Sequence, residues 1–213
     1  MNRTHIKICG ITRLKDALEI ANLGVGALGF IIYPPSKRYI APPDIADIVA
    51  SLPPFIQKIG VFVNHPLPEL IKIMQVAKLN LAQLHGDESV EYTNQLTKAK
   101  INWYKAIRLK NDADLAKIAD YSCHNILIDS WQKGDYGGTG KLINHKKFAN
   151  LSETIKSSNK QIILAGGLNA DNILNSITDF RPVAVDVSSG VEDFPGKKNI
   201  IKVTNFIKAL EKS

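Results

Sequence analysis

The stretch Gln161-Ile162-Ile163-Leu164-Ala165-Gly166-Gly167 is a short, nearly continuous apolar run that ends in two glycines. Strands that are buried on both faces have this composition, and a parallel sheet buries both faces of its strands. Eight such runs are spaced along the 213 residues of the chain. They predict strands at His5–Cys9, Ala27–Ile32, Gln57–Val63, Asn80–Leu84, Trp103–Ile107, Asn125–Ile128, Gln161–Ala165 and Val183–Val187.

Amphipathic segments separate the predicted strands, and their apolar residues recur three and four positions apart. The predicted helices are Leu14–Asn22, Asp44–Ser51, Pro68–Ala77, Ser89–Leu96, Asp112–Ala119, His145–Leu151, Asp171–Ile177 and Asn199–Leu210. Thr12, Asp44 and Asn169 are expected to cap the first, second and seventh of these helices. Eight strand–helix repeats predict an α/β fold, a (β/α)8 TIM barrel, with residues 1–213 as a single domain. An open, doubly wound sheet is the alternative.

The composition is that of a folded protein with an excess of positive charge. Apolar residues make up 45% of the chain and charged residues 22%, and the formal net charge is +7. The lysines are spread out, without a basic run or interleaved aromatic residues, so a solvated basic surface is favoured over a nucleic-acid partner. No apolar run approaches the roughly 20 residues of a membrane span. The start of the chain lacks the pattern of a signal peptide, and we expect a cytoplasmic protein.

The two cysteines, Cys9 and Cys123, are too few for a disulfide framework. They also lack zinc-binding spacing relative to histidine or to each other. We therefore expect two free thiols, with Cys123 as a small buried apolar side chain. We expect neither a metal nor a cofactor.

The residues that follow the strands of a TIM barrel form its catalytic face. In this chain those positions are rich in polar residues and glycine, as an active site requires. The seventh predicted strand ends at Gly166-Gly167, and Ser189-Gly190 follows the eighth. Backbone N–H groups at such positions can approach a phosphate closely, so a phosphate site is favoured over mere tight turns. The segment Gly137–Gly140 is either a flap or a third phosphate contact.

Cys9 and Asp129 stand at the ends of the first and sixth predicted strands. Because side chains alternate along a strand, Lys7 and Cys9 share one face, which should point into the barrel. A thiol and a carboxyl group that converge on one ligand can act as base and acid, whereas an aspartate at a strand end is also often a cap or a salt-bridge partner. His85 is either catalytic or a hydrogen-bonded turn residue. Arg38 either lies at the surface or grips a carboxylate with two N–H groups.

Five motifs of the chain resemble those of phosphoribosylanthranilate isomerases, in the order that the family has them. They are Lys7-Ile8-Cys9-Gly10-Ile11-Thr12, Gln83-Leu84-His85-Gly86-Asp87-Glu88, Asp129-Ser130 with Gly137-Gly138-Thr139-Gly140, Leu164-Ala165-Gly166-Gly167-Leu168 and Val185-Asp186-Val187-Ser188-Ser189-Gly190-Val191-Glu192. The resemblance implies a TIM barrel that converts N-(5'-phosphoribosyl)anthranilate to 1-(2-carboxyphenylamino)-1-deoxyribulose 5-phosphate. The reaction is an Amadori rearrangement in tryptophan biosynthesis.

The resemblance also implies roles for individual residues. Cys9 would be the general base and Asp129 the general acid of this intramolecular oxidoreductase, an aldose–ketose isomerase. Arg38 would bind the anthranilate carboxylate. The remaining implied residues are Lys7, His85 and Asp186 for the substrate, and Gly138, Gly166, Gly167, Ser189 and Gly190 for the phosphate. The implied partner is the small-molecule substrate, with no nucleic acid and no membrane, and the chain would be a monomer or a homodimer.

Two positions depart from the family pattern. Lys37 stands where proline is common, and Asn199 stands where aspartate is expected near the start of the last predicted helix. The alternative enzymes are an indole-glycerol-phosphate synthase and a pentose-phosphate epimerase. The synthase should have extra N-terminal sequence and catalytic lysines on several strands, and the epimerase needs histidine and aspartate metal ligands that the strand ends do not supply. A non-catalytic binding protein, suggested by the basic charge, is the alternative outside enzymes.

Overall fold

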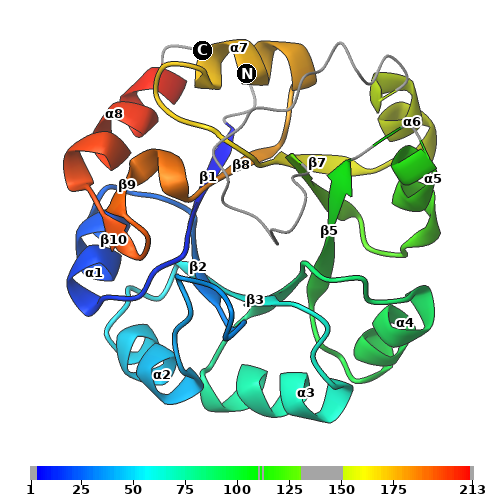
Figure 1. Cartoon of the computed structure of the whole chain (residues 1–213), viewed down its shortest axis with the longest axis horizontal. Helices are drawn as coiled ribbons and strands as arrows, with labels where there is room; N and C mark the ends of the chain where they lie inside the picture. Colours follow the sequence, from blue (N-terminus) through cyan, green and yellow to red (C-terminus); the bar gives the residue numbers. More distant parts are fainter. Residues whose placement is uncertain (1–3, 110, 112, 131–150, 212–213) are drawn as a thin grey trace.

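The computed structural model describes residues 4–109, 111, 113–130 and 151–211. Eight parallel strands close into a barrel in chain order, which Figure 1 shows in the view along the shortest axis of the molecule. The predicted TIM barrel is therefore confirmed, because β1 pairs with β8 and leaves no open edge. The strands are β1 His5–Cys9, β2 Ala27–Ile31, β3 Gln57–Phe62, β4 Leu81–Leu84, β5 Trp103–Leu109, β6 Asn125–Ser130, β7 Gln161–Leu164 and β8 Ala184–Val187.

Helices surround the barrel and cover its outer face (Figure 1). Their apolar faces pack on outward-pointing strand residues such as Ile8, Leu28 and Phe30, which are fully buried. This burial explains the amphipathic pattern of the sequence. The helices are α1 Leu14–Asn22, α2 Pro42–Ala50, α3 Leu67–Val76, α4 Val90–Lys98, α5 Ala113–Asp120, α6 Leu151–Ser158, α7 Ile173–Phe180 and α8 Ile200–Leu210.

The alternate residues of the strands point into the barrel. Ile59, Tyr104 and Leu127 belong to a buried cluster that is separate from the outer layers. Lys7 of β1 also points inward, and its register partner on β8 is Asp186. The barrel interior is thus apolar in part and carries charged groups below the catalytic rim.

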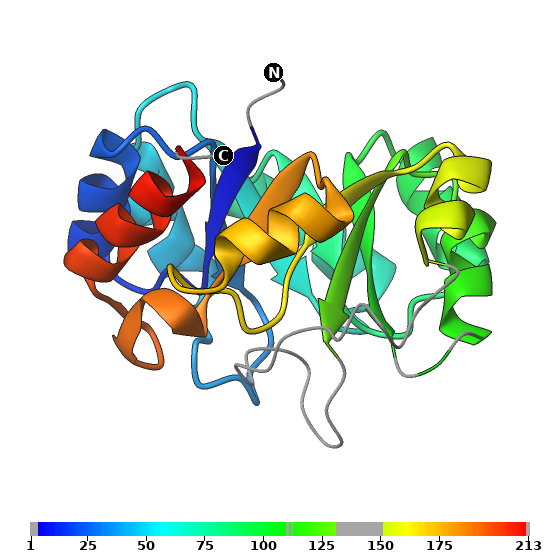
Figure 2. The same cartoon turned by 90° about the horizontal axis from the view of Figure 1, so that it is seen from above.

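A short hairpin that the sequence analysis did not predict follows β8. After the 3-10 turn η2 (Ser189–Val191), β9 (Glu192–Phe194) and β10 (Lys197–Lys198) pair in antiparallel fashion. Figure 2 shows this hairpin and the loop between β2 and α2 at the end to which the strands point, opposite the end where β1 begins. The hairpin therefore brings its charged residues to the catalytic rim.

The first two helices start differently from the prediction. The residue before α1 is Arg13, which makes no side-chain capping bond, and Thr12 instead donates to the Gly196 carbonyl at 2.6 Å. The second helix begins at Pro42, because proline fits the first helical position, where its missing N–H is not needed. Asp44 therefore lies inside the first turn and does not cap it.

The start of α7 also differs from the prediction, whereas α8 carries a side-chain cap. Asn169 accepts two backbone N–H groups in the turn that leads into α7, but the residue directly before this helix is Asn172, which makes no side-chain capping bond. Asn199 accepts two backbone N–H groups at the start of α8, so its departure from the family pattern does concern helix capping.

Two further expectations are corrected around α5 and α6. α6 spans Leu151–Ser158 where the prediction was His145–Leu151; residues 145–150 lie outside the described residues. Ile155 packs against the apolar cluster beside β6 and gives α6 its inner face. Cys123 is only partly buried, because it lies in the connection between α5 and β6 at the edge of that cluster. None of the helices in the described part of the chain is long and apolar enough to cross a membrane.

Candidate active site

A pocket at the carboxyl ends of the strands brings most of the predicted site residues together. Lys7 donates to the pocket residue Asp186, Gly190 follows the pocket residue Ser189, and Gly138 lies outside the described residues. The predicted residues that line the pocket are Cys9, Arg38, His85, Asp129, Gly166, Gly167, Asp186 and Ser189.

Cys9, at the end of β1, presents a buried free thiol to the pocket. Burial raises the pKa of this thiol above its ordinary value, and the charge and hydrogen bond of Lys7 act in the opposite direction. Burial alone would lower the pKa of Lys7, but Asp186 raises it overall, because its Oδ2 accepts from Lys7 Nζ at 2.7 Å. Lys7 therefore keeps its positive charge beside Cys9. This charge lowers the pKa of the thiol by less than burial raises it.

Two buried side-chain oxygen atoms of the pocket have no hydrogen-bond partner within the described residues. They are Oδ1 of Asp186 and Oγ of Ser188, and both residues line the pocket. An unsatisfied buried polar group costs about 1–3 kcal/mol, so such groups call for a functional explanation. Polar groups of a bound ligand could satisfy both atoms.

Asp129, at the end of β6, faces His85 across the pocket. Its Oδ2 lies 3.3 Å from His85 Nε2, which has no hydrogen-bond partner among the described residues. Nδ1 of His85 lies 2.8 Å from Nε2 of Gln83, and Gln83 Oε1 accepts from the Tyr104 hydroxyl at 2.6 Å. His85 thus belongs to a buried polar chain that leads to Asp129.

Arg38, in the loop between β2 and α2, makes a two-pronged contact with Glu192 on the hairpin. Its Nε and Nη2 donate to the carboxylate over 2.7–3.0 Å. Glu192 also accepts from Lys198 Nζ at 2.7 Å, and the same ammonium donates to the backbone carbonyls of Cys9 and Ser188. Burial alone would raise the pKa of Glu192, but these two cations lower it. The cluster holds the guanidinium at the pocket and fixes the backbone beside the thiol.

The loops after β7 and β8 form the wall in which a phosphate site is predicted. Gly166 and Gly167 have φ angles of 89° and 64°, in the left-handed region that side chains rarely tolerate. A Cβ on Gly190 would lie 1.9 Å from the Leu168 carbonyl oxygen, so the two loops touch at this point. With Ser189, these glycines form a wall with few side chains, which suits backbone contacts to a phosphate.

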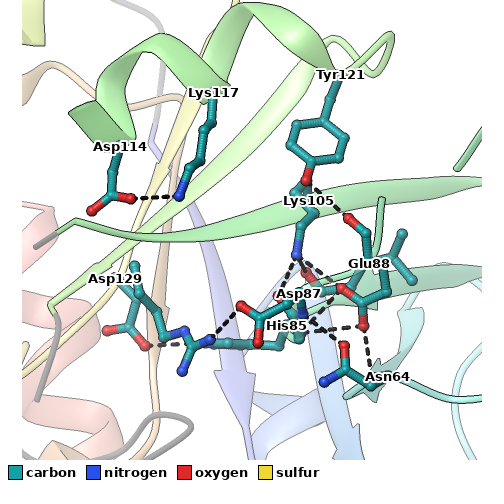
Figure 3. Close-up of polar contacts among 12 residues, drawn as sticks. Asn64, His85, Asp87, Glu88, Lys105, Asp114, Lys117, Tyr121 and Asp129 are labelled. Carbon is teal, nitrogen blue, oxygen red and sulfur yellow. Dashed lines mark hydrogen bonds and ion pairs between the residues drawn. The ribbon is translucent and has the colours of Figure 1, made fainter. Parts of the chain in front are cut away.

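A second polar cluster supports the rim at the ends of β4 and β5. Lys105 Nζ donates to the Glu88 carboxylate at 2.8 Å and to two backbone carbonyls, one of them that of Gly86 (Figure 3). Glu88 also accepts the N–H groups of Asn64 and Gly86. Burial lowers the pKa of Lys105, and Glu88 opposes this effect. These contacts fix the turn that immediately follows His85.

In the residues that the structure describes, no group of three or more His, Cys, Asp or Glu side chains could hold a metal ion.

The sequence analysis missed four members of the site: Gln83, Tyr104, Glu192 and Lys198. Gln83 carries a usable signal, because it is a polar residue in an apolar strand and stands two positions before His85, on the same face. Glu192 and Lys198 have no such signal, since the hairpin that places them has no clear strand pattern.

A closed parallel barrel with a thiol, carboxyl groups and an arginine in one pocket at its carboxyl-terminal rim defines the class of TIM-barrel enzymes. The family model for N-(5'-phosphoribosyl)anthranilate (PRA) isomerase matches residues 6–209. The chain belongs to this family.

Individual relatives agree with the family model over nearly their whole length. The N-(5'-phosphoribosyl)anthranilate isomerase of Thermotoga petrophila is 40% identical over 204 residues, covering 96% of this chain and 97% of the relative. The N-(5'-phosphoribosyl)anthranilate isomerase of Trichlorobacter lovleyi is 42% identical over 204 residues, covering 95% of this chain and 96% of the relative.

Solved structures of the family have the same fold. The phosphoribosyl anthranilate isomerase of Thermotoga maritima has a TM-score of 0.89 and 38% identity, covering 99% of this chain and 100% of that one. A structure in complex with reduced 1-(o-carboxyphenylamino)-1-deoxyribulose 5-phosphate has a TM-score of 0.85 and 37% identity, with coverage of 99% and 100%. Another solved structure is that of monomers generated from the dimeric Thermotoga maritima protein. It has a TM-score of 0.84 and 35% identity, covering 99% of this chain and 100% of that one.

Proposed function

We propose that this protein isomerises N-(5'-phosphoribosyl)anthranilate to 1-(2-carboxyphenylamino)-1-deoxyribulose 5-phosphate in tryptophan biosynthesis. The reaction moves hydrogen within one molecule and makes the enzyme an intramolecular oxidoreductase. The observation that carries the proposal is the shared pocket of Cys9 and Asp129, which lie at the ends of β1 and β6. A thiol and a carboxyl group on one pocket supply the base and the acid that an Amadori rearrangement needs.

The reaction begins with opening of the ribose ring. Asp129, in its protonated form, gives its proton to the ring oxygen as the bond from that oxygen to C1′ breaks. The nitrogen lone pair forms the C1′=N bond, which leaves a protonated Schiff base. This cation makes the hydrogen on C2′ acidic and prepares the second step.

Cys9, as the thiolate, then removes the proton from C2′. The electron pair forms a C1′=C2′ bond and neutralises the nitrogen, which gives an enolamine. The enolamine gains a proton at C1′ and loses the proton of its 2′-hydroxyl, which gives the ketone. Proton exchange with the medium restores Cys9 and Asp129. The charge of Lys7 supports the base step because it lowers the pKa of the Cys9 thiol against the effect of burial.

The rest of the pocket suits the remaining parts of this substrate. Arg38 is proposed to bind the anthranilate carboxylate, with Glu192 holding its guanidinium in place. The unsatisfied oxygen of Asp186 suits a sugar hydroxyl. The phosphate is proposed to bind at the wall formed by Gly166, Gly167, Ser189 and Gly190, with Gly138 as a further contact. A monomer or a homodimer and a cytoplasmic location stay predictions.

Single substitutions of the two proposed catalytic residues test the mechanism. Cys9→Ser and Asp129→Asn should each lower kcat by about 10²–10⁴-fold, because a hydroxyl ionises far less readily than a thiol and an amide has no acidic proton. Both variants should bind the reduced product analogue within about threefold of the wild type, or less than about 0.7 kcal/mol. Cys123→Ser, which changes the other thiol, is the matched control and should leave kcat unchanged. Near-native turnover in either catalytic variant would refute the role of that residue.

A further inference from the structure

A buried chain of polar side chains, in which hydrogen bonds join Tyr104, Gln83 and His85, leads through the barrel to Asp129. Tyr104 donates to Oε1 of Gln83 at 2.6 Å, and Nε2 of Gln83 lies 2.8 Å from Nδ1 of His85. Nε2 of His85 then lies 3.3 Å from Oδ2 of Asp129. All four residues are between 1% and 7% exposed. Because polar groups buried this deeply need matched donors and acceptors, the orientation of each group constrains the next.

The first member of this chain acts as a donor towards Gln83. Burial raises the pKa of Tyr104, so its hydroxyl keeps its proton. The Lys7 ammonium is close enough to act electrostatically on the same hydroxyl. A nearby cation attracts the lone pairs of the oxygen and repels its proton. The proton of Tyr104 therefore points to Gln83 and selects the amide oxygen as its acceptor.

The orientation of the Gln83 amide sets the tautomer of His85. With the amide oxygen turned to Tyr104, the NH2 group faces Nδ1 of His85. A neutral imidazole that accepts at Nδ1 carries its proton on Nε2. This N–H is the one that faces Asp129. Contacts of this kind are often poorly aligned without substrate and tighten when it binds.

We propose that Tyr104 and Gln83 are positioning residues, which fix the Nε2–H tautomer of His85 and so direct the acidic proton of Asp129 to Oδ1. A donor at Oδ2 leaves the other oxygen to carry the proton. The same N–H stabilises the carboxylate that forms as the proton leaves, an effect that is stronger in the transition state than in the ground state. The opposite tautomer would turn a lone pair to Oδ2, where it would hold the Asp129 proton away from the substrate. The inference rests on the acid role proposed for Asp129.

Nitrogen-15 spectra of the histidine rings test the tautomer without any turnover. The protein is labelled at histidine and measured at about pH 8, where free imidazole is neutral. The His85 signals are assigned as those missing from a His85→Asn variant. We expect a protonated Nε2 and an unprotonated Nδ1 in the wild type. In Tyr104→Phe the two nitrogens should become more alike, because both tautomers are populated. In Gln83→Glu, Nδ1 should become protonated, because a carboxylate only accepts.

Kinetics then connect the tautomer to catalysis. Tyr104→Phe should lower kcat about tenfold, the loss that corresponds to one net hydrogen bond, with KM changed by less than about threefold. Tyr92→Phe is the matched control, since the Tyr92 hydroxyl also donates to a partly buried acceptor, the His65 carbonyl, at 2.8 Å. The control should keep the wild-type spectrum and kcat.

Three results would overturn the proposal: a protonated Nδ1 in the wild type, an unchanged His85 spectrum in Tyr104→Phe, or an unchanged kcat in that variant. Failure of the acid role would look different. Asp129→Asn would then keep its activity, while the wild-type spectrum would still report the tautomer of His85.

Discussion

Replacing Glu192 with glutamine removes the charge that joins the Arg38 guanidinium to the catalytic rim. In the wild type, Glu192 Oε2 accepts from Arg38 at 2.7 Å, and Oε1 accepts from Lys198 at 2.7 Å and from the Gly196 N–H at 3.2 Å. Both carboxylate oxygens are therefore needed as acceptors. Glutamine has one oxygen and one NH2 group. Either Arg38 loses its acceptor, or Lys198 and the Gly196 N–H lose theirs, and the donors that remain face the NH2 group instead.

The size of the effect follows from burial. The Lys198 and Glu192 side chains are 1% and 3% exposed, so the cations left behind have little access to water. Removing one partner of a buried ion pair costs about 3–5 kcal/mol. We expect the lower end, about 3 kcal/mol, because glutamine retains one acceptor. Since 1 kcal/mol corresponds to about 2–4 °C in a domain of this size, the melting temperature should fall by about 6–12 °C.

Thermal unfolding followed by circular dichroism measures this change, with Glu19→Gln as the matched control. Glu19 pairs with Lys15 on the exposed surface of α1 at 3.8 Å, and such a pair contributes about 0–1 kcal/mol. The control should shift the melting temperature by no more than about 4 °C. A Glu192→Gln shift as small as that of the control would refute the view that this carboxylate balances two buried cations.

The pH dependence of the same measurement has a definite sign. The pKa of Glu192 is lowered in the folded protein, so its contribution is fully present above the ordinary glutamate pKa of about 4.3. It is lost as the pH falls through the lowered folded-state pKa. The stability difference between wild type and Glu192→Gln should therefore persist at pH 5 and shrink only below about pH 4. A difference that disappears between pH 7 and pH 5 would point to another group.

The remaining predictions concern the pocket. Arg38→Ala should weaken binding of a carboxylate-bearing product analogue by about 10–100-fold, or about 1.5–3 kcal/mol, and barely affect an analogue without the carboxylate. Equal losses of affinity for the two analogues, measured by calorimetry, would contradict the role of Arg38. Gly167→Val should raise KM strongly, because it blocks backbone approach to the phosphate and strains a φ of 64°, and an unchanged KM would count against the phosphate site. Lys7→Met should raise the pKa of Cys9 further, so alkylation of Cys9 should become fast only at a higher pH, measured in a Cys123→Ser background. A shift to lower pH would show that Lys7 does not favour the thiolate.

The barrel itself could be predicted because its determinants are local. Buried strands show as apolar runs, and amphipathic helices show as a repeat of three and four residues. One error arose where the decisive contact is distant in sequence. Thr12 looks like a helix cap, but its hydroxyl finds the Gly196 carbonyl, 184 residues away. The hairpin after β8 was missed because two short, charged strands have no apolar pattern.

The site was predictable to the extent that its residues stand at strand ends. Cys9 and Asp129 could be placed on one rim because the carboxyl ends of parallel strands meet there. The partners that orient them could not be placed. Gln83 and Tyr104 meet across neighbouring strands, and their contact depends on the register between β4 and β5. That register follows from the closure of the whole barrel, which no local pattern encodes.

Three buried lysines link the stability of this barrel to the geometry of its rim. Each pairs with a carboxylate 2.7–2.8 Å away, and the pairs are Lys7–Asp186, Lys105–Glu88 and Lys198–Glu192. Apolar residues of similar volume often stabilise a protein as well as such pairs do, so stability alone does not explain them. Each pair does something an apolar cluster cannot. One places a charge beside the thiol, one fixes the turn after His85, and one holds the backbone next to Cys9. The directed hydrogen bonds of these pairs set the positions of neighbouring groups, which dispersion contacts leave less defined.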